Sequence, residues 1–256
     1  MEKTQQQLSQ PILSLPKFQT ADEFTRLTLG IEKEKMDSSI SFTDGQTVSI
    51  VGDTKYSQIL LTRLCVRALT PIRHGGCGFS NVIIIDAGNS SDIYQYVNFA
   101  RQYGLDIKKI LQSIIVSRPF TIYQLAQLII YELPTIIQKS NDNVKMLIIP
   151  DLLIMFLKDP QVKAKEACVI LKQIVSSIRK ISLNNNIISL VSLPYHDKRS
   201  SINDKSLLSR FDKHIVITRV DYYPSLFDIK MINKSRYQQN KFSLQERDLM
   251  ITSSVR

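Results

Sequence analysis

The chain has 256 residues, and its 43% hydrophobic content is enough for one sizeable buried core without any apolar run of the roughly 18 residues that span a membrane. Its three widely spaced cysteines argue against a disulfide framework or a cysteine-ligated metal. Together with the lack of a spanning apolar run, this leads us to expect a cytoplasmic protein with no membrane partner. The formal net charge of +10 is compatible with an acidic partner such as nucleic acid, although charge alone identifies none.

The first part of the chain is polar and then becomes helical in pattern. Residues 1–17 contain two prolines and few apolar residues, which is typical of a mobile arm. In residues 18–30, Thr20 and Glu23 have the spacing of a capping box. This spacing predicts a linker helix that begins at Ala21 and ends near Gly30.

The middle of the chain alternates short apolar runs with longer amphipathic segments. The apolar runs are at 48–51, 82–85, 114–116, 146–149 and 187–191. Such continuous runs are typical of strands that are buried on both faces. The clearest helical pattern, at about 164–183, places apolar residues on one side and charged residues on the other. The alternation predicts an α/β fold with a mainly parallel sheet and helices on both of its faces.

The end of the chain is richer in strand patterns than in helical ones. Residues 214–218 and 226–232 are candidate strands, separated by a turn sequence at 221–224. They predict an antiparallel extension at one edge of the sheet. We therefore assign residues 31–245 to one core domain and residues 246–256 to a C-terminal tail.

Six segments, considered together, carry a resemblance to a known family. They are FQTADEF at 18–24, VSIVGD at 48–53, NVIIIDAGNSSDIYQYVNFARQYGLD at 81–106, IIVSRPFTIYQ at 114–124, VKMLIIPDLLIMF at 144–156 and NNNIISLVS at 184–192. In order and spacing they resemble the RecA/RadA recombinases, specifically the archaeal and eukaryotic branch and its paralogs. The resemblance covers about residues 18–232 and implies a RecA-like core.

The nucleotide-binding loop departs from the pattern of this family. A Walker A loop uses glycines to wrap backbone N–H groups around phosphates, with a lysine and a hydroxyl for the phosphates and Mg²⁺. The segment here reads VGDTKYS, in which Gly52 is the one glycine and Asp53 would repel a phosphate. Lys55 and Ser57 match the lysine and hydroxyl, whereas Tyr56 is too bulky for close backbone approach. The alternative is a plain turn between a strand and a helix.

Two further catalytic positions are also altered relative to the family. Ala87 aligns with the acid that positions the attacking water, and Asp86 lies beside it. Pro150 aligns with the metal-linked aspartate of Walker B, and Asp151 follows one place later, where helix capping or a solvated loop is the alternative role. The resemblance thus implies degenerate Walker A and B motifs and little or no ATP hydrolysis. We predict no resident cofactor and no metal ligands, with ATP and Mg²⁺ as the alternative at four candidate cofactor-binding residues: Gly52, Lys55, Ser57 and Asp151.

A Phe-x-x-Ala element precedes the core, and Phe18 and Ala21 match it residue for residue. In the family, this element docks on a neighbouring protomer, where the phenyl ring fills a pocket and adjacent backbone extends the neighbour's sheet. The resemblance implies partner-binding roles for both residues. The alternative is that Phe18 packs on its own domain as a hydrophobic staple.

Clusters of basic residues form a second candidate interface, for single-stranded DNA. One cluster follows the fifth core strand, and the other, at 229–245, is interleaved with Tyr237 and Phe242. Cationic groups would follow phosphates while the aromatic rings stack on bases. The alternative is a solvated basic edge strand that discourages aggregation. The candidate DNA-binding residues are Lys198, Arg199, Lys230, Lys234, Arg236 and Lys241.

These observations favour a non-catalytic RadA-like paralog that binds a recombinase and single-stranded DNA and thereby modulates DNA recombination and repair. Its partners would be a RadA-type recombinase or paralog, or further copies of the chain itself. Two alternatives stay open. The first is a divergent ATPase or nucleotide sensor of the same fold, and the second is a scaffold subunit of an unrelated complex.

Overall fold

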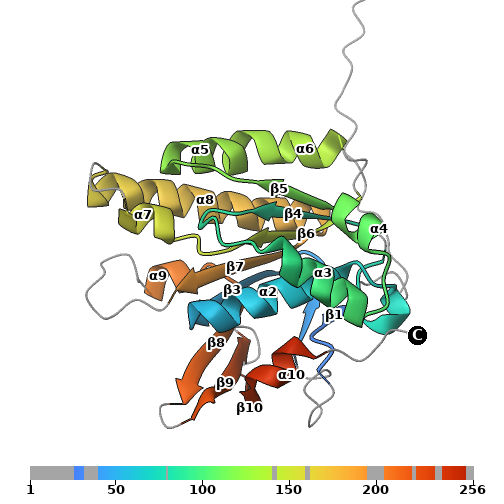
Figure 1. Cartoon of the computed structure of the whole chain (residues 1–256). Coiled ribbons are helices and arrows are strands. Elements are labelled where there is room, and N and C mark those ends of the chain that lie inside the picture. The colour runs from blue at the N-terminus through green and yellow to red at the C-terminus, as the bar shows by residue number, and fades with distance from the viewer. Residues whose placement is uncertain are drawn as a thin grey trace, which may run out of the picture.

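The computed structural model of the protein describes residues 26–31, 40–78, 80–139, 143–158, 162–194, 205–220, 223–233 and 238–251. Within these ranges, an eight-stranded sheet lies between two layers of helices (Figure 1). A second, two-stranded sheet lies beside it. No helix in the described ranges is long and apolar enough to cross a membrane.

The large sheet is parallel over most of its width and antiparallel at one edge. Its strands follow the order β10-β9-β8-β3-β7-β6-β4-β5, with parallel pairing from β8 to β5 and antiparallel pairing from β8 to β10. The bounds are β3 (Thr47–Gly52), β4 (Asn81–Ile85), β5 (Ile114–Ser117), β6 (Val144–Ile149), β7 (Ile188–Pro194), β8 (Lys213–Val220), β9 (Tyr223–Asn233) and β10 (Gln238–Gln245). The predicted fold class is confirmed.

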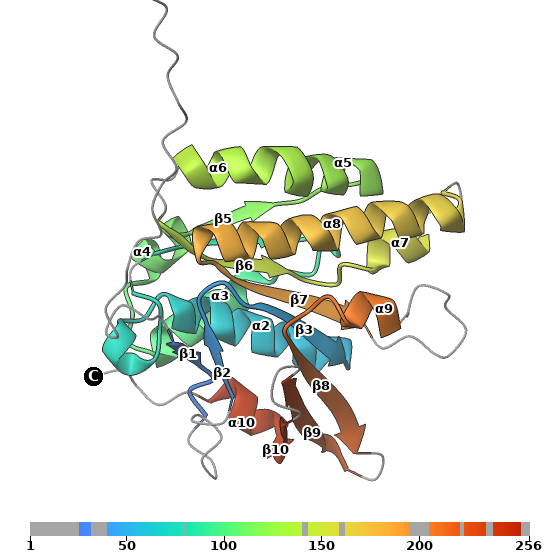
Figure 2. The ribbon, with the colours of Figure 1, turned by 180° about the vertical axis from the view of Figure 1, so that it is seen from behind.

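Helices cover both faces of this sheet. Figure 1 shows α2 and α3 in front of the sheet, and Figure 2, seen from behind, shows α8 in front of it. The bounds are α2 (Thr54–Ala68), η2 (Ile72–His74), α3 (Ile93–Gln102), α4 (Ile107–Gln112), α5 (Ile122–Gln127), the π-helical turn η3 (Leu128–Glu132), α6 (Leu133–Lys139), α7 (Ile154–Lys158), α8 (Ala164–Asn185), α9 (Lys205–Leu208) and α10 (Glu246–Met250).

Strand β4 is continuously apolar in sequence because both of its faces are buried. Val82 and Ile84 pack into the core on the side of α2 and α3, while Ile83 and Ile85 pack into the core on the side of α5 and α8. Successive side chains of a strand point to opposite faces, so both sets must be apolar when both faces are covered.

The predicted linker helix is wrong where the structure describes it. Residues Arg26–Thr28 form strand β1, which pairs antiparallel with β2 (Ser41–Thr43). Leu27 is fully buried in the core on the α2 side, so tertiary packing overrides the local capping signal. The arm and residues 18–25, including Phe18 and Ala21, lie outside the described part of the chain.

The C-terminal segment also differs from the predicted tail. Residues Glu246–Met250 form helix α10, whose first turn carries a capping box between Gln245 and Asp248. Leu249 is fully buried, in the same core as α2. The core therefore extends beyond residue 245, at least to the end of this helix.

Candidate functional site

The turn from β3 to α2 stands where the resemblance places a phosphate-binding loop. Gly52 has a φ of 141°, and a Cβ there would collide with the carbonyl of Ile217 on the neighbouring strand β8. The Asp53 carboxylate caps α2 by accepting from the N–H of Tyr56 at 3.2 Å, and it forms an ion pair with Arg219 at 2.8 Å. Close strand packing explains the glycine, and a protein carboxylate already occupies the helix N-terminus.

Lys55 and Tyr56 of this turn also contact other parts of the protein. Lys55 forms an ion pair with Glu246 of α10 at 2.7 Å, and the hydrogen bond that Lys55 donates to Glu246 raises the pKa of Lys55 above its ordinary value. Tyr56 is 1% exposed and stacks on Phe227 with 4.3 Å between ring centroids. Ser57 is buried, and within the described residues its hydroxyl has no hydrogen-bond partner. The Lys55 side chain is 57% exposed, but it is already paired with a carboxylate.

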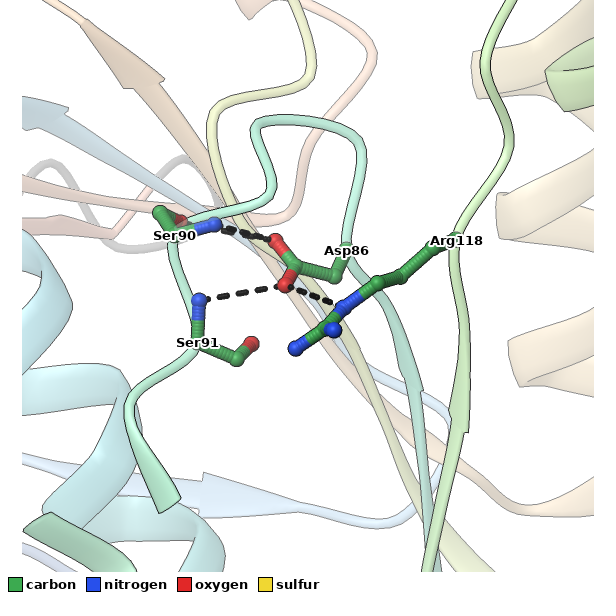
Figure 3. Close-up of polar contacts among 4 residues, drawn as sticks. All are labelled: Asp86, Ser90, Ser91 and Arg118. Atoms are coloured by element: carbon green, nitrogen blue, oxygen red, sulfur yellow. Dashed lines mark hydrogen bonds and ion pairs between the residues drawn. The ribbon is translucent and has the colours of Figure 1, made fainter. Parts of the chain in front are cut away.

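Asp86 at the end of β4 organises the loop that follows this strand (Figure 3). Its buried carboxylate accepts from the backbone N–H groups of Ser90 at 2.8 Å and Ser91 at 3.1 Å. The third donor is Nε of Arg118, at 3.3 Å, which follows the end of β5. The Arg118 side chain is 51% exposed, whereas the Asp86 side chain is fully buried. Beside Asp86, Ala87 is buried and offers only a methyl group.

Asp151 is buried just beyond the end of β6, the strand next to β4 in the sheet. Its φ is 48°, its backbone N–H donates to Oγ of Ser192 at 2.7 Å, and its carboxylate accepts from Nε2 of Gln58 at 3.2 Å. Burial raises the pKa of Asp151, and the hydrogen bonds from Gln58 and Ser192 offset part of that rise. The alternative role in a solvated loop is wrong, because the residue is 3% exposed. Through Gln58 the carboxylate contacts α2, the helix that carries Lys55 and Ser57.

The basic residues of the antiparallel edge are only partly as predicted. Lys230 and Lys241 lie directly opposite each other on β9 and β10, but Lys241 pairs with Asp228 at 2.8 Å. Burial raises the pKa of Asp228, but hydrogen bonds from Lys241 and Ser243 outweigh it and leave the pKa below its ordinary value. Phe242 packs against the core on the opposite face, so it is not interleaved with the lysines. The other four candidate DNA-binding residues are outside the described ranges: Lys198, Arg199, Lys234 and Arg236.

Strand β5 forms an open apolar edge that the sequence did not reveal. Among the described strands β5 has one neighbour, β4, and its Ile115 and Val116 side chains are 40% and 46% exposed. Phe120, just beyond the strand, is 85% exposed. A pocket of about 390 Å³ opens beside the strand, between Val116, Arg118 and the α3 residues Ile93 and Tyr96. The prediction that this run is buried on both faces is therefore wrong.

The two buried thiols, Cys65 and Cys77, are not reactive groups in this structure. Cys65 and Cys77 are both buried. Burial raises the pKa of Cys77 to about 12, and it raises the pKa of Cys65 as well. Neither thiol forms a nucleophilic thiolate at neutral pH.

Comparison with known families decides the identity of this core. The model of the Rad51 family matches residues 36–193, which is more than half of the chain. The chain belongs to the Rad51 family. No curated protein sequence matches it. Family membership gives the protein a recombinase-like role in DNA repair or recombination and, in general terms, interactions with recombinase filaments and DNA.

For a Rad51-family protein, the β3–α2 turn is a poor fit to ATP and Mg²⁺. A triphosphate needs free backbone N–H groups and an available lysine, but Asp53 caps the helix and Lys55 is paired with Glu246. Tyr56 fills the space beside the turn through its contact with Phe227. The residues present do not match the requirements of the nucleotide, so no catalytic step is assigned to them.

Proposed function

We propose that this protein is a non-catalytic Rad51-family paralog that binds a recombinase filament and modulates homologous recombination. The observation that carries this proposal is the turn between β3 and α2, where Asp53, Lys55 and Tyr56 are all engaged by other residues of the protein. A protein that keeps the scaffold without a nucleotide site acts through binding rather than through phosphoryl transfer.

The open edge of β5 supports a binding role from an independent direction. An exposed strand edge beside an apolar pocket can accept an extended segment, which adds a strand and places a side chain in the pocket. In this proposal, the Phe-x-x-Ala element with Phe18 and Ala21, near the N-terminus, is such a segment. A chain with both a donor segment and an acceptor edge fits within a head-to-tail filament, where it serves as a unit without ATPase activity.

Nucleotide titration tests the non-catalytic part of the proposal. We expect no Mg²⁺-dependent ATP binding by calorimetry at concentrations up to about 1 mM, because no lysine or helix N-terminus is available in the turn. ATP binding that disappears in Lys55→Ala would support the alternative of a divergent ATPase or nucleotide sensor. The absence of measurable ATP binding in both the wild type and Lys55→Ala agrees with the proposal.

Recovery of a RadA-type recombinase on immobilised protein tests the docking part. Phe18→Glu should reduce recovery at least about tenfold, because it removes the aromatic anchor and puts a charge where the partner has an apolar pocket. Lys17→Glu introduces the same charge one residue away and should leave recovery close to that of the wild type. Equal recovery by wild type and Phe18→Glu would leave Phe18 without a role in the interface.

Single-stranded DNA binding is the remaining part of the proposal, and it depends on the predicted basic residues. Affinity should fall with salt and on neutralising Lys234 and Arg236, because phosphate contacts release counterions. Lys241→Gln should have a smaller effect, since Lys241 is already paired with Asp228. Binding that responds neither to salt nor to Lys234 and Arg236 would exclude this patch.

A further inference from the structure

The largest fully buried side chain among the described residues is a charged one, Arg63 of α2. A guanidinium keeps its charge at every physiological pH, so burial is tolerated only when its N–H groups are matched by acceptors. The acceptors here are backbone carbonyls from two segments that are far apart in the sequence. Arg63 therefore joins two ends of the fold rather than forming a surface contact.

One of these segments is the arm root, defined here as residues 26–31. Nε of Arg63 donates to the carbonyl of Leu29 at 2.9 Å, and Nη2 donates to the carbonyl of Gly30. Gly30 has a φ of 66°, and a Cβ there would collide with the guanidinium of Arg67. The arm root thus passes close to two arginines of α2 in a conformation that favours glycine.

The second segment is helix α10, at the other end of the described chain. Nη1 of Arg63 donates to the carbonyls of Leu249 and Ile251, each at 2.8 Å, and to that of Asp248 at 3.2 Å. The last carbonyls of a helix have no N–H donor within the helix itself. An arginine that donates to them therefore satisfies acceptors that would otherwise be unpaired. The same guanidinium thus terminates α10 and holds the arm root.

Neither segment is long enough to be stable by itself. Helix α10 has five residues, far below the roughly 12–15 at which an isolated helix becomes even marginally stable in water. Strand β1 has three residues and belongs to a two-stranded sheet, which is also marginal alone. In Figure 1, α10 and β1 lie beside α2, the element that carries their shared arginine. Each segment therefore depends on tertiary contacts, and Arg63 supplies contacts to both.

We propose that Arg63 is a conformational coupler between the arm root and helix α10. When α10 leaves its place, the guanidinium loses its acceptors there, and the arm root loses a fixed donor. A partner that displaces α10 would then loosen the root from which the Phe-x-x-Ala segment extends. This consequence for docking rests on the proposed function, whereas the coupling itself is a property of the chain alone.

Hydrogen exchange on the isolated full-length chain tests the coupling without any recombinase. Leu249→Ala removes the buried anchor of α10 and should accelerate exchange of amides at 27–31 at least about fivefold. Leu27→Ala removes the buried anchor of the arm root and should accelerate exchange at 246–251. Coupling free energies are reciprocal, so the two effects should agree within about twofold.

Two further variants complete the experiment. Ile178→Ala creates a similar cavity in the core on the other face of the sheet and should leave local exchange in both segments unchanged. Arg63→Met should accelerate exchange in both segments at once, and the paired leucine variants decide the question if this protein does not fold. Acceleration confined to the mutated segment, in either leucine variant, would overturn the proposal. Because no partner is added, a failure of recombinase binding leaves this result untouched.

Discussion

The β3–α2 turn and the β5 edge belong to one sheet, but they differ in how far their side chains are buried or paired within the protein. At the turn, Tyr56 is 1% exposed and Lys55 is ion-paired, so groups of the kind that bind ligands are used internally. At the edge, Val116 and Phe120 are 46% and 85% exposed, although burial would stabilise both. The difference supports the proposed function, in which the nucleotide position is closed and the β5 edge is the surface that accepts another protein chain.

The largest effect expected from this comparison is on stability at the turn. Tyr56→Ala should lower the free energy of unfolding by about 3–5 kcal/mol, because it leaves a cavity next to Phe227. Urea unfolding measures the change. Tyr94→Ala is the matched control, since Tyr94 is 81% exposed and its loss should change stability by less than about 0.5 kcal/mol.

The same variant also asks how the turn is closed. Tyr56→Ala should not gain ATP binding, because Asp53 still caps α2 and Glu246 still pairs with Lys55. Calorimetry with Mg²⁺ and ATP measures this. A clear gain of binding would mean that the aromatic ring alone blocks a competent phosphate site, and the contrast between the two regions would weaken.

Arg118 connects the β5 edge to the loop that follows β4, because it lines the pocket beside β5 and pairs with Asp86 at the end of β4. Arg118→Met should cost about 1–3 kcal/mol of stability, since the buried carboxylate then keeps only the donors from Ser90 and Ser91 and loses this cation. Arg101→Met, on the exposed surface of α3, serves as the control in the same urea titration. Equal stability of the two variants would show that the ion pair contributes nothing measurable.

Sequence reasoning predicted the central strands and α8 well, because burial on two faces or on one stripe leaves a clear apolar pattern. It failed at β5, since an apolar run cannot distinguish a central strand from an edge strand. It also missed β1 and α10, whose short sequences depend on tertiary contacts, including those with Arg63. The unusual sequence of the β3–α2 turn is visible in Asp53 and Tyr56 alone, whereas their contacts with Arg219 and Phe227 depend on the tertiary structure. The Asp86–Arg118 pair likewise depends on the register of β4 against β5.

At the edge, a charge should weaken partner binding with little effect on folding. Val116→Glu should reduce recovery of a RadA-type recombinase about tenfold, corresponding to about 1.4 kcal/mol, if a partner strand adds to β5. Val169→Glu on α8 is the matched control, because Val169 is 54% exposed and distant in sequence from the edge. Equal losses in both variants would point to a general effect of charge rather than to docking at β5.

The smallest expected effect concerns Asp151, whose pKa is raised above 3.8 mainly by burial. A carboxyl with a raised pKa in the folded state binds its proton more tightly when folded. Its contribution to stability is complete below 3.8 and is lost as the pH rises through the folded-state pKa. Asp151→Asn does not titrate, and its amide can still accept from Gln58. It should therefore be more stable than the wild type at neutral pH, by less than about 1 kcal/mol.

Urea unfolding at a series of pH values tests this prediction, and the gain should shrink as the pH falls toward 3.8. The result bears on the comparison because an ionised Asp151 has an unfavourable environment and no described cation beside it. A loss of stability in Asp151→Asn at neutral pH would mean that the fold requires the charged form. Such a requirement would favour the alternative in which this edge of the sheet still serves a nucleotide and its metal ion.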